Sequence, residues 1–104
     1  MDKKKLIREL KRFKYKIEKL YPLQKMILFG SRANGTTHKD SDVDLIIVGN
    51  FKEKSNLKRA PRFYLEWDID LPVDFICYTP EEYKKLARRI TIVREAKRNG
   101  IEIK

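Results

Sequence analysis

Residues 25–48 decide the fold, and they read KMILFGSRANGTTHKDSDVDLIIV. The first five form an apolar run that Gly30 ends, which is typical of a strand entering a turn. The last six are apolar on both faces and rich in β-branched side chains, so we predict over 43–48 a central strand covered on both sides. Between them lies a polar loop, 31–41, in which Ser31 is suited to cap one or two helical turns.

Helical and extended patterns alternate through the rest of the chain. Apolar residues recur at helical spacing from Lys3 to Leu20, and Pro22 ends that helix. This order of elements predicts an α/β or α+β domain with a small sheet. The other predicted elements are a polar connection over 49–56, a helix over 57–67 that starts or kinks at Pro61, a strand over 73–78, a helix that begins at Thr79 with a capping box, a helix from about Thr91 that Asn99-Gly100 ends, and a tail or short edge strand over 101–103.

Length and composition narrow the class of protein. A chain of 104 residues suits one domain with a single core, and we expect no second domain. The apolar runs are too short to span a membrane, and the charged N-terminus does not fit a signal peptide. The single cysteine, Cys77, fits a reducing compartment, so we expect a cytoplasmic protein. The net charge of +10 indicates an anionic partner, although the 38% of charged residues is equally typical of thermophilic proteins.

Two carboxylates stand at the entrance to the predicted central strand. Asp42 and Asp44 flank Val43, and residues two apart in a strand point to the same face. Like charges buried together are costly unless a cation neutralises them, and Mg²⁺ binds one or two carboxylates together with substrate phosphates. Asp74 repeats the pattern in the strand over 73–78. We predict that these three carboxylates hold one or two metal ions for displacement at phosphorus, although acidic pairs at strand ends are commonly just solvated.

The pair Gly30-Ser31 supplies a complementary group upstream of the carboxylates. A glycine lets the backbone approach a phosphate closely, N–H groups at a helix start attract anions, and the serine hydroxyl can donate to the same phosphate. Gly-Ser alone is an ordinary turn dipeptide. Together with the acidic pair, it predicts a phosphate-binding turn and a metal site at one end of the sheet.

The two motifs together resemble a known signature. Residues 29–35 (FGSRANG) and 41–45 (SDVDL) are similar to the Gly-Ser, ten-residue spacer, Asp-x-Asp pattern of the DNA polymerase β-like nucleotidyltransferases. The chain most resembles the minimal nucleotidyltransferases of prokaryotes, and the resemblance covers 1–104 as a single minimal domain. It implies a small mixed sheet flanked by helices.

The resemblance also implies roles for individual residues. Gly30 and Ser31 would hold the triphosphate of ATP, the Asp-x-Asp pair would bind Mg²⁺, and Asp74 would complete a site for two ions. Asn34 stands where the common family loop has Arg. Arg32 or Lys39 would replace that charge, so Arg32 joins the predicted nucleotide-binding residues.

The resemblance finally implies a reaction and a partner. Minimal nucleotidyltransferases commonly act as antitoxins that transfer AMP to a tyrosine of a HEPN-domain ribonuclease toxin, so we expect a hetero-complex with such a toxin. One alternative is a non-catalytic antitoxin that neutralises its partner by binding. Another is an RNA-binding module, which would leave the carboxylates unexplained and would use the basic residues of the first helix: Lys4, Lys5, Arg8, Lys11, Arg12 and Lys19.

Other reactive or aromatic side chains have simpler interpretations. We expect His38 to be an exposed loop residue. Cys77 lies among apolar residues and is expected in the core. Tyr64 and Trp67 could stack on a nucleobase, but core packing is the interpretation that their helical spacing favours.

Overall fold

The computed structural model describes residues 1–35, 41–89 and 91–104, and within these ranges one mixed sheet has the strand order β3-β2-β1-β4. Strand β1 pairs antiparallel with β2 and with β4, whereas β2 and β3 run parallel. The predicted small mixed sheet flanked by helices is therefore confirmed. The strands are β1 (Lys25–Phe29), β2 (Val43–Val48), β3 (Val73–Tyr78) and β4 (Ile101–Glu102).

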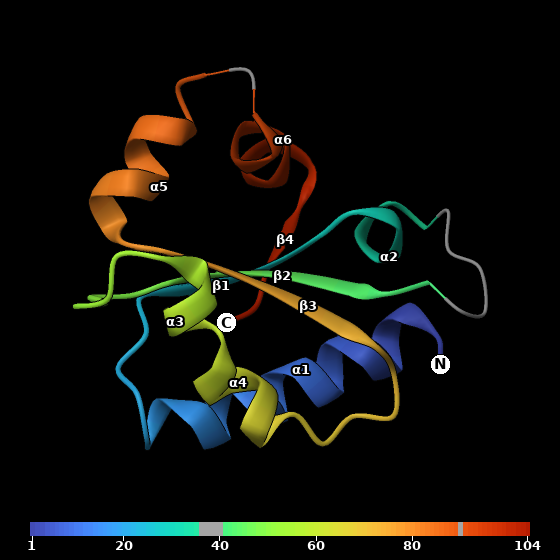
Figure 1. Cartoon of the computed structure of the whole chain (residues 1–104). Coiled ribbons are helices and arrows are strands. Elements are labelled where there is room, and N and C mark those ends of the chain that lie inside the picture. Colours follow the sequence, from blue (N-terminus) through green and yellow to red (C-terminus); the bar gives the residue numbers. More distant parts are fainter. Residues whose placement is uncertain (36–40, 90) are drawn as a thin grey trace.

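Helices cover both faces of this sheet (Figure 1). Helices α1, α3 and α4 lie on one side, and α5 and α6 lie on the other. None of the helices in the described ranges combines the length and apolar character needed to cross a membrane. The helices are α1 (Lys3–Glu18), α2 (Ser31–Asn34), α3 (Asn56–Arg59), α4 (Pro61–Glu66), α5 (Pro80–Leu86) and α6 (Ile92–Asn99).

The larger part of the core lies between the sheet and α1, on what we call the α1 face. Alternate strand residues such as Leu28, Leu45 and Phe75 point to this face. The ring of Phe13 from α1 is fully buried there, with its centroid 5.0 Å from that of Trp67 and 5.9 Å from that of Phe75. Aromatic pairs at this spacing add to the stabilisation from burial.

The opposite side of the sheet, which we call the α6 face, holds a smaller buried cluster. Ile27, Ile46 and Val48 point to this face and meet one residue of α5 and two of α6: Tyr83, Val93 and Ala96. Because side chains of a strand alternate between faces, the other β2 residues of the same parity lie on this face too. Asp44 is one of them.

The predicted elements agree with the structure except at three boundaries. The capping box of α5 is present, with the Glu82 N–H donating to the Thr79 hydroxyl and the Glu82 carboxylate accepting from the Thr79 N–H. Helix α1 ends at Glu18 rather than Leu20. The predicted helix over 57–67 is two helices, and the predicted start at Pro61 is confirmed. The prediction of Ser31 as a cap is wrong: Gly30 is the cap, since the chain turns there with a positive φ.

The outer edge of β3 is covered by side chains from α3 and α4. The Asn56 amide donates to the Phe75 carbonyl at 3.0 Å and accepts from the Cys77 N–H at 2.7 Å. The Tyr64 hydroxyl accepts from the Phe75 N–H, and the Arg59 guanidinium donates to the Cys77 carbonyl. The backbone N–H and C=O groups that Phe75 and Cys77 direct outward therefore all have a hydrogen-bond partner.

Candidate active site

The candidate site is built on the turn at the end of β1. Gly30 has φ 75° and ψ −158°, a region that glycine alone adopts without strain. Its carbonyl accepts from the N–H groups of Ala33 and Asn34, both at 3.1 Å, and so starts α2. A Cβ at this position would lie 2.5 Å from Oδ2 of Asp44. Glycine is therefore required both by the backbone turn and by the carboxylate that lies against it.

Strand pairing brings the predicted carboxylates to the same end of the sheet. Asp44 is directly opposite Phe29 on β1 and is paired in register with Asp74 on β3. Asp42 precedes β2 by one residue, and the next N–H, that of Val43, donates to the Pro72 carbonyl at 2.8 Å. Asp44 thus lies against the Gly30 turn, Asp74 is paired beside it on the next strand, and Asp42 lies two residues before it at the same end of the sheet.

The environments of the three carboxylates differ. Asp42 and Asp74 are exposed, whereas Asp44 is half-buried. Burial raises the pKa of Asp44 above its usual range, and the negative charges of Asp74 and Asp42 raise it further. The charged form of Asp44 is therefore disfavoured by the surrounding protein, as expected of a carboxylate built to meet a cation.

These residues fit a hard divalent cation by their chemistry. Carboxylate oxygens are the ligands that Mg²⁺ prefers, and a cation beside Asp44 would offset the repulsion that raises its pKa. Within residues 1–35, 41–89 and 91–104, no three acidic, histidine or cysteine side chains are grouped tightly enough to enclose one ion. A Mg²⁺ ion at this site would need further oxygen ligands, such as substrate phosphates, in addition to the carboxylates.

Arg32 lies behind this site rather than in the solvent-exposed part of it. Its side chain is buried, and its Nε and Nη2 donate to the Ser41 carbonyl at 3.0 and 2.8 Å. Ser41 immediately precedes Asp42, so the guanidinium fixes the approach to β2. The predicted contact of Arg32 with nucleotide stays a prediction, and the hydrogen bonds described for Arg32 go to the Ser41 carbonyl.

The remaining loop residues are only partly described. Asn34 is exposed at the end of α2, and Lys3 of α1 donates to the Ala33 carbonyl at 3.0 Å. The sequence indicates no role for Lys3, because its contact with the Ala33 carbonyl of α2 arises only in the folded chain. His38 and Lys39 lie outside the described residues.

Two predictions about non-catalytic side chains are borne out in the core. Cys77 is buried, and burial raises the pKa of its thiol to about 12, which makes it a poor nucleophile. Trp67 packs on Phe13 and Phe75. The Tyr64 ring also contacts Phe75 but remains 43% exposed.

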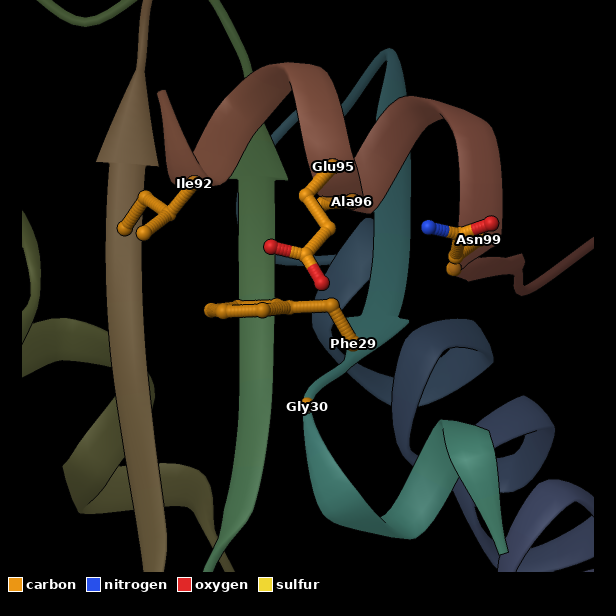
Figure 2. Close-up of a pocket in the computed structure, with 7 residues that line it drawn as sticks. Phe29, Gly30, Ile92, Glu95, Ala96 and Asn99 are labelled. Atoms are coloured by element: carbon orange, nitrogen blue, oxygen red, sulfur yellow. The ribbon is translucent and has the colours of Figure 1, made fainter. Parts of the chain in front are cut away.

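Sequence reasoning missed the contribution of α6. A cavity beside Gly30 is walled by Phe29 and by one face of α6 that carries Ile92, Glu95 and Asn99 (Figure 2). The spacing of these three α6 residues places them on one side of a helix. That pattern was visible in the sequence, but the proximity of α6 to the Gly30 turn was not.

A glycine turn at a strand end, facing carboxylates on two neighbouring strands, defines a site of the phosphoryl-transfer class. Residues 10–99 match the family described as Nucleotidyltransferase domain, and the chain belongs to that family. The predicted nucleotidyltransferase is confirmed at this level.

Named relatives support the same family. The chain is 30% identical over 92 residues to a candidate protein adenylyltransferase of Haemophilus influenzae, covering 83% of this chain and 78% of that protein. It is 32% identical over 105 residues to a candidate protein adenylyltransferase of Methanocaldococcus jannaschii, covering 94% of this chain and 98% of that protein.

Two solved structures share the fold. A candidate nucleotidyltransferase from Sulfolobus solfataricus aligns with a TM-score of 0.69 at 20% identity, over 96% of this chain and 80% of that one. A chain of a toxin-antitoxin structure with AMP-PNP aligns with a TM-score of 0.53 at 21% identity, over 90% of this chain and 72% of that one.

Proposed function

We propose that this chain is an Mg²⁺-dependent nucleotidyltransferase that transfers AMP from ATP to a hydroxyl group of a partner protein. The observation that carries the proposal is the contact between Asp44 and the Gly30 turn at one end of the sheet. A half-buried carboxylate with a raised pKa lies against a turn that only glycine keeps open. Such a site suits a substrate that is both anionic and metal-bound, as a nucleoside triphosphate is.

In this proposal the three carboxylates hold the metal. Asp42 and Asp44 would hold Mg²⁺, and Asp74 would contribute to the site of a second ion. Bound Mg²⁺ supplies positive charge that offsets the negative charge of the phosphate oxygens. Membership of the nucleotidyltransferase family and the carboxylate donor set support this assignment.

The chain's own groups orient the nucleotide and the acceptor. The Ser31 hydroxyl donates to a phosphate oxygen, and Arg32 fixes the Ser41 carbonyl and so the position of Asp42. Asp74, which is exposed, accepts the proton of the incoming hydroxyl. The new oxygen–phosphorus bond forms as the bond to pyrophosphate breaks, and pyrophosphate leaves with that electron pair.

We further propose that the acceptor is a tyrosine of a HEPN-domain toxin and that the chain is the antitoxin of the pair. Two relatives are candidate protein adenylyltransferases, and one structural neighbour is a toxin-antitoxin protein solved with AMP-PNP. The resemblance to minimal nucleotidyltransferases supplies the HEPN class and the tyrosine.

One observation favours a second candidate, an antitoxin that acts by binding alone. Asn34 replaces the arginine of the common family loop and is exposed. Arg32, which was expected to restore that charge, is buried against the Ser41 carbonyl. Among the described residues of this loop, Asn34 carries no charge and the Arg32 guanidinium is directed at the Ser41 carbonyl. Lys39, the other candidate to replace the charge, lies outside the described residues.

Transfer of label from ATP labelled at the α-phosphate tests the proposal. The purified chain is incubated with Mg²⁺ and a lysate of its source cells, and labelled proteins are separated by size. Asp44→Asn is the test variant. Glu81→Gln is the matched control, because it removes an exposed carboxylate from α5, at the opposite end of β3.

We expect one labelled band with the unmodified chain and with Glu81→Gln, and a loss of at least about 100-fold with Asp44→Asn. No label, with Mg²⁺-dependent ATP binding retained, would favour the binding-only antitoxin. Absence of both label and binding would show that the assignment of the site is wrong.

A further inference from the structure

A cavity of about 210 Å³ opens beside the proposed phosphate site. Its floor is the ring of Phe29, the last residue of β1, and its wall is the exposed side of α6 (Figure 2). Ligand pockets for whole drug-sized molecules are usually about 300–1,000 Å³. This cavity is therefore suited to one ring system and not to a complete nucleotide.

The cavity lies on the same face and at the same end of the sheet as the carboxylates. Phe29 is paired directly opposite Asp44, so both side chains point to the α6 face. Gly30 lines the cavity, and the Asp44 carboxylate occupies the space that a Cβ at Gly30 would fill. A nucleotide whose phosphates meet the Gly30 turn can thus extend directly into the cavity.

The lining of the cavity does not suit an anion. The chain has 25 Lys and Arg residues, yet none of them lines this cavity within the described part of the chain. The lining is apolar apart from the Glu95 carboxylate and the Asn99 amide. Figure 2 shows the Glu95 carboxylate over the Phe29 ring, with Ile92 on one side and Asn99 on the other.

We propose that this cavity binds the nucleobase of the nucleoside triphosphate and selects adenine. The flat base stacks on Phe29, as aromatic side chains allow for any base, when the exposed Glu95 side chain turns its carboxylate from over the ring to the edge of the base. The Glu95 carboxylate accepts a hydrogen bond from the exocyclic amino group, and the Asn99 amide, which both donates and accepts, matches the adjacent donor and acceptor of adenine. This inference rests on the proposed function, since it deepens the use of the same site.

The same chemistry disfavours the other bases. Guanine in the same orientation presents a carbonyl oxygen where adenine has its amino group, and a carboxylate cannot donate to it; guanine would have to turn in the cavity to offer its N1–H and 2-amino donors to Glu95. Uracil has the same defect and offers less surface for stacking. Cytosine has the amino group but is smaller than a purine, so its contact with Phe29 is reduced.

Competition binding tests the proposal without any transfer reaction. A fluorescent ATP labelled on the ribose is bound to the purified chain with Mg²⁺, and unlabelled ATP, GTP, CTP, UTP and inorganic tripolyphosphate are titrated against it. The variants are Glu95→Gln, Asn99→Ala and Phe29→Leu. Glu95 and Asn99 are exposed, so their variants are expected to fold, and Glu81→Gln again controls for loss of a carboxylate.

We expect ATP to bind at least about 10-fold more tightly than GTP or UTP. In Glu95→Gln the amide can donate to the guanine carbonyl, so the ratio of ATP to GTP affinity should fall to about threefold or less. Asn99→Ala should lower ATP affinity about 10-fold without changing tripolyphosphate affinity. Glu81→Gln should leave every ratio unchanged.

Three results would contradict the proposal, and the first two differ in what else they overturn. If triphosphates bind with Mg²⁺ but Glu95→Gln and Asn99→Ala leave base preference unchanged, the base pocket is wrong and the proposed function stands. If neither nucleotides nor tripolyphosphate bind, both are wrong. Adenosine alone, titrated into ¹⁵N-labelled protein, is the second measurement: shifts confined away from Phe29, Gly30 and α6 would also contradict the pocket.

Discussion

The two faces of the sheet differ in what their side chains contribute. The α1 face carries the larger buried cluster, with Phe13, Phe63 and Phe75 fully buried in it. The α6 face has a smaller cluster, and its site end carries Asp44 and the open cavity. Since burial of apolar surface is the main stabilising term, most of the folding free energy comes from the α1 face. The α6 face can therefore carry groups that are unfavourable for stability.

The largest expected effect is on the α1 face. Phe13→Ala should lower the free energy of unfolding by about 3–5 kcal/mol, because it leaves a cavity between Trp67 and Phe75. Val93→Ala on the α6 face should cost about 2 kcal/mol. Urea unfolding followed by circular dichroism measures both, and equal losses would refute the difference between the faces.

Next in size is the effect of adding one methyl group to the site turn. Gly30→Ala should destabilise the chain by about 2–3 kcal/mol, because the positive φ is strained and the new Cβ collides with the Asp44 carboxylate. Gly35→Ala is the control, since Gly35 has φ 77° but open space where its Cβ would lie. Gly35 has ψ 10°, in the left-handed helical region, whereas Gly30 has ψ −158°, so the difference between the two variants measures the collision together with the greater backbone strain at Gly30. Equal losses of unfolding free energy would show that neither adds a cost.

A smaller effect of opposite sign is expected at the central carboxylate. Asp44→Asn removes a charge that burial and two neighbouring carboxylates disfavour, so it should raise the free energy of unfolding slightly while label transfer is lost. Asp42 is exposed, so Asp42→Asn should change stability less. A rise in melting temperature together with loss of transfer would support the conclusion that the α6 face carries groups that are unfavourable for stability. A fall would mean that Asp44 has a structural role.

The smallest expected effect lies on the outer surface of α1. Arg12 donates to Asp68 at 2.9 and 3.1 Å and, with Lys16, lowers the pKa of that carboxyl to about 2. Because the folded pKa is below its usual value, the stabilisation is present above about pH 4 and is lost as the pH falls toward 2. The pair is exposed to solvent, so it contributes less than about 1 kcal/mol.

Thermal unfolding between pH 2 and pH 5 measures this contribution. The melting temperature of Asp68→Asn should fall less steeply with decreasing pH than that of the unmodified chain. Asp70→Asn is the control, because Asp70 makes no ion pair among the described residues. Parallel curves for all three proteins would show that the pair contributes nothing.

Local elements could be predicted from sequence because local physics determines them. The apolar run over 43–48 gave a central strand, and Thr79-Pro80 with Glu82 gave the start of α5. Ser31 was taken as a cap because its residue type suits that position. The positive φ of Gly30 moved the cap one residue earlier, and no residue pattern reveals a φ value.

The candidate site was predicted in part. Asp42 and Asp44 share a face by strand alternation, which the sequence shows directly. The pairing of Asp44 with Asp74 depends on the register between two parallel strands, and spacing alone does not set that register. The cavity forms because Phe29 and Asn99, which are far apart in the sequence, both line it in the fold, so sequence reasoning did not find it.

The covered edge of β3 has a consequence for how this chain assembles with other proteins. Side chains of Asn56, Arg59 and Tyr64 occupy the outward backbone groups that an incoming strand would need. At the other edge of the described sheet, β4 is only two residues long. The edges of the described sheet therefore offer few unpaired backbone groups for edge-to-edge aggregation or strand exchange. A strand that adds to this edge of β3 would first have to displace the side chains of Asn56, Arg59 and Tyr64.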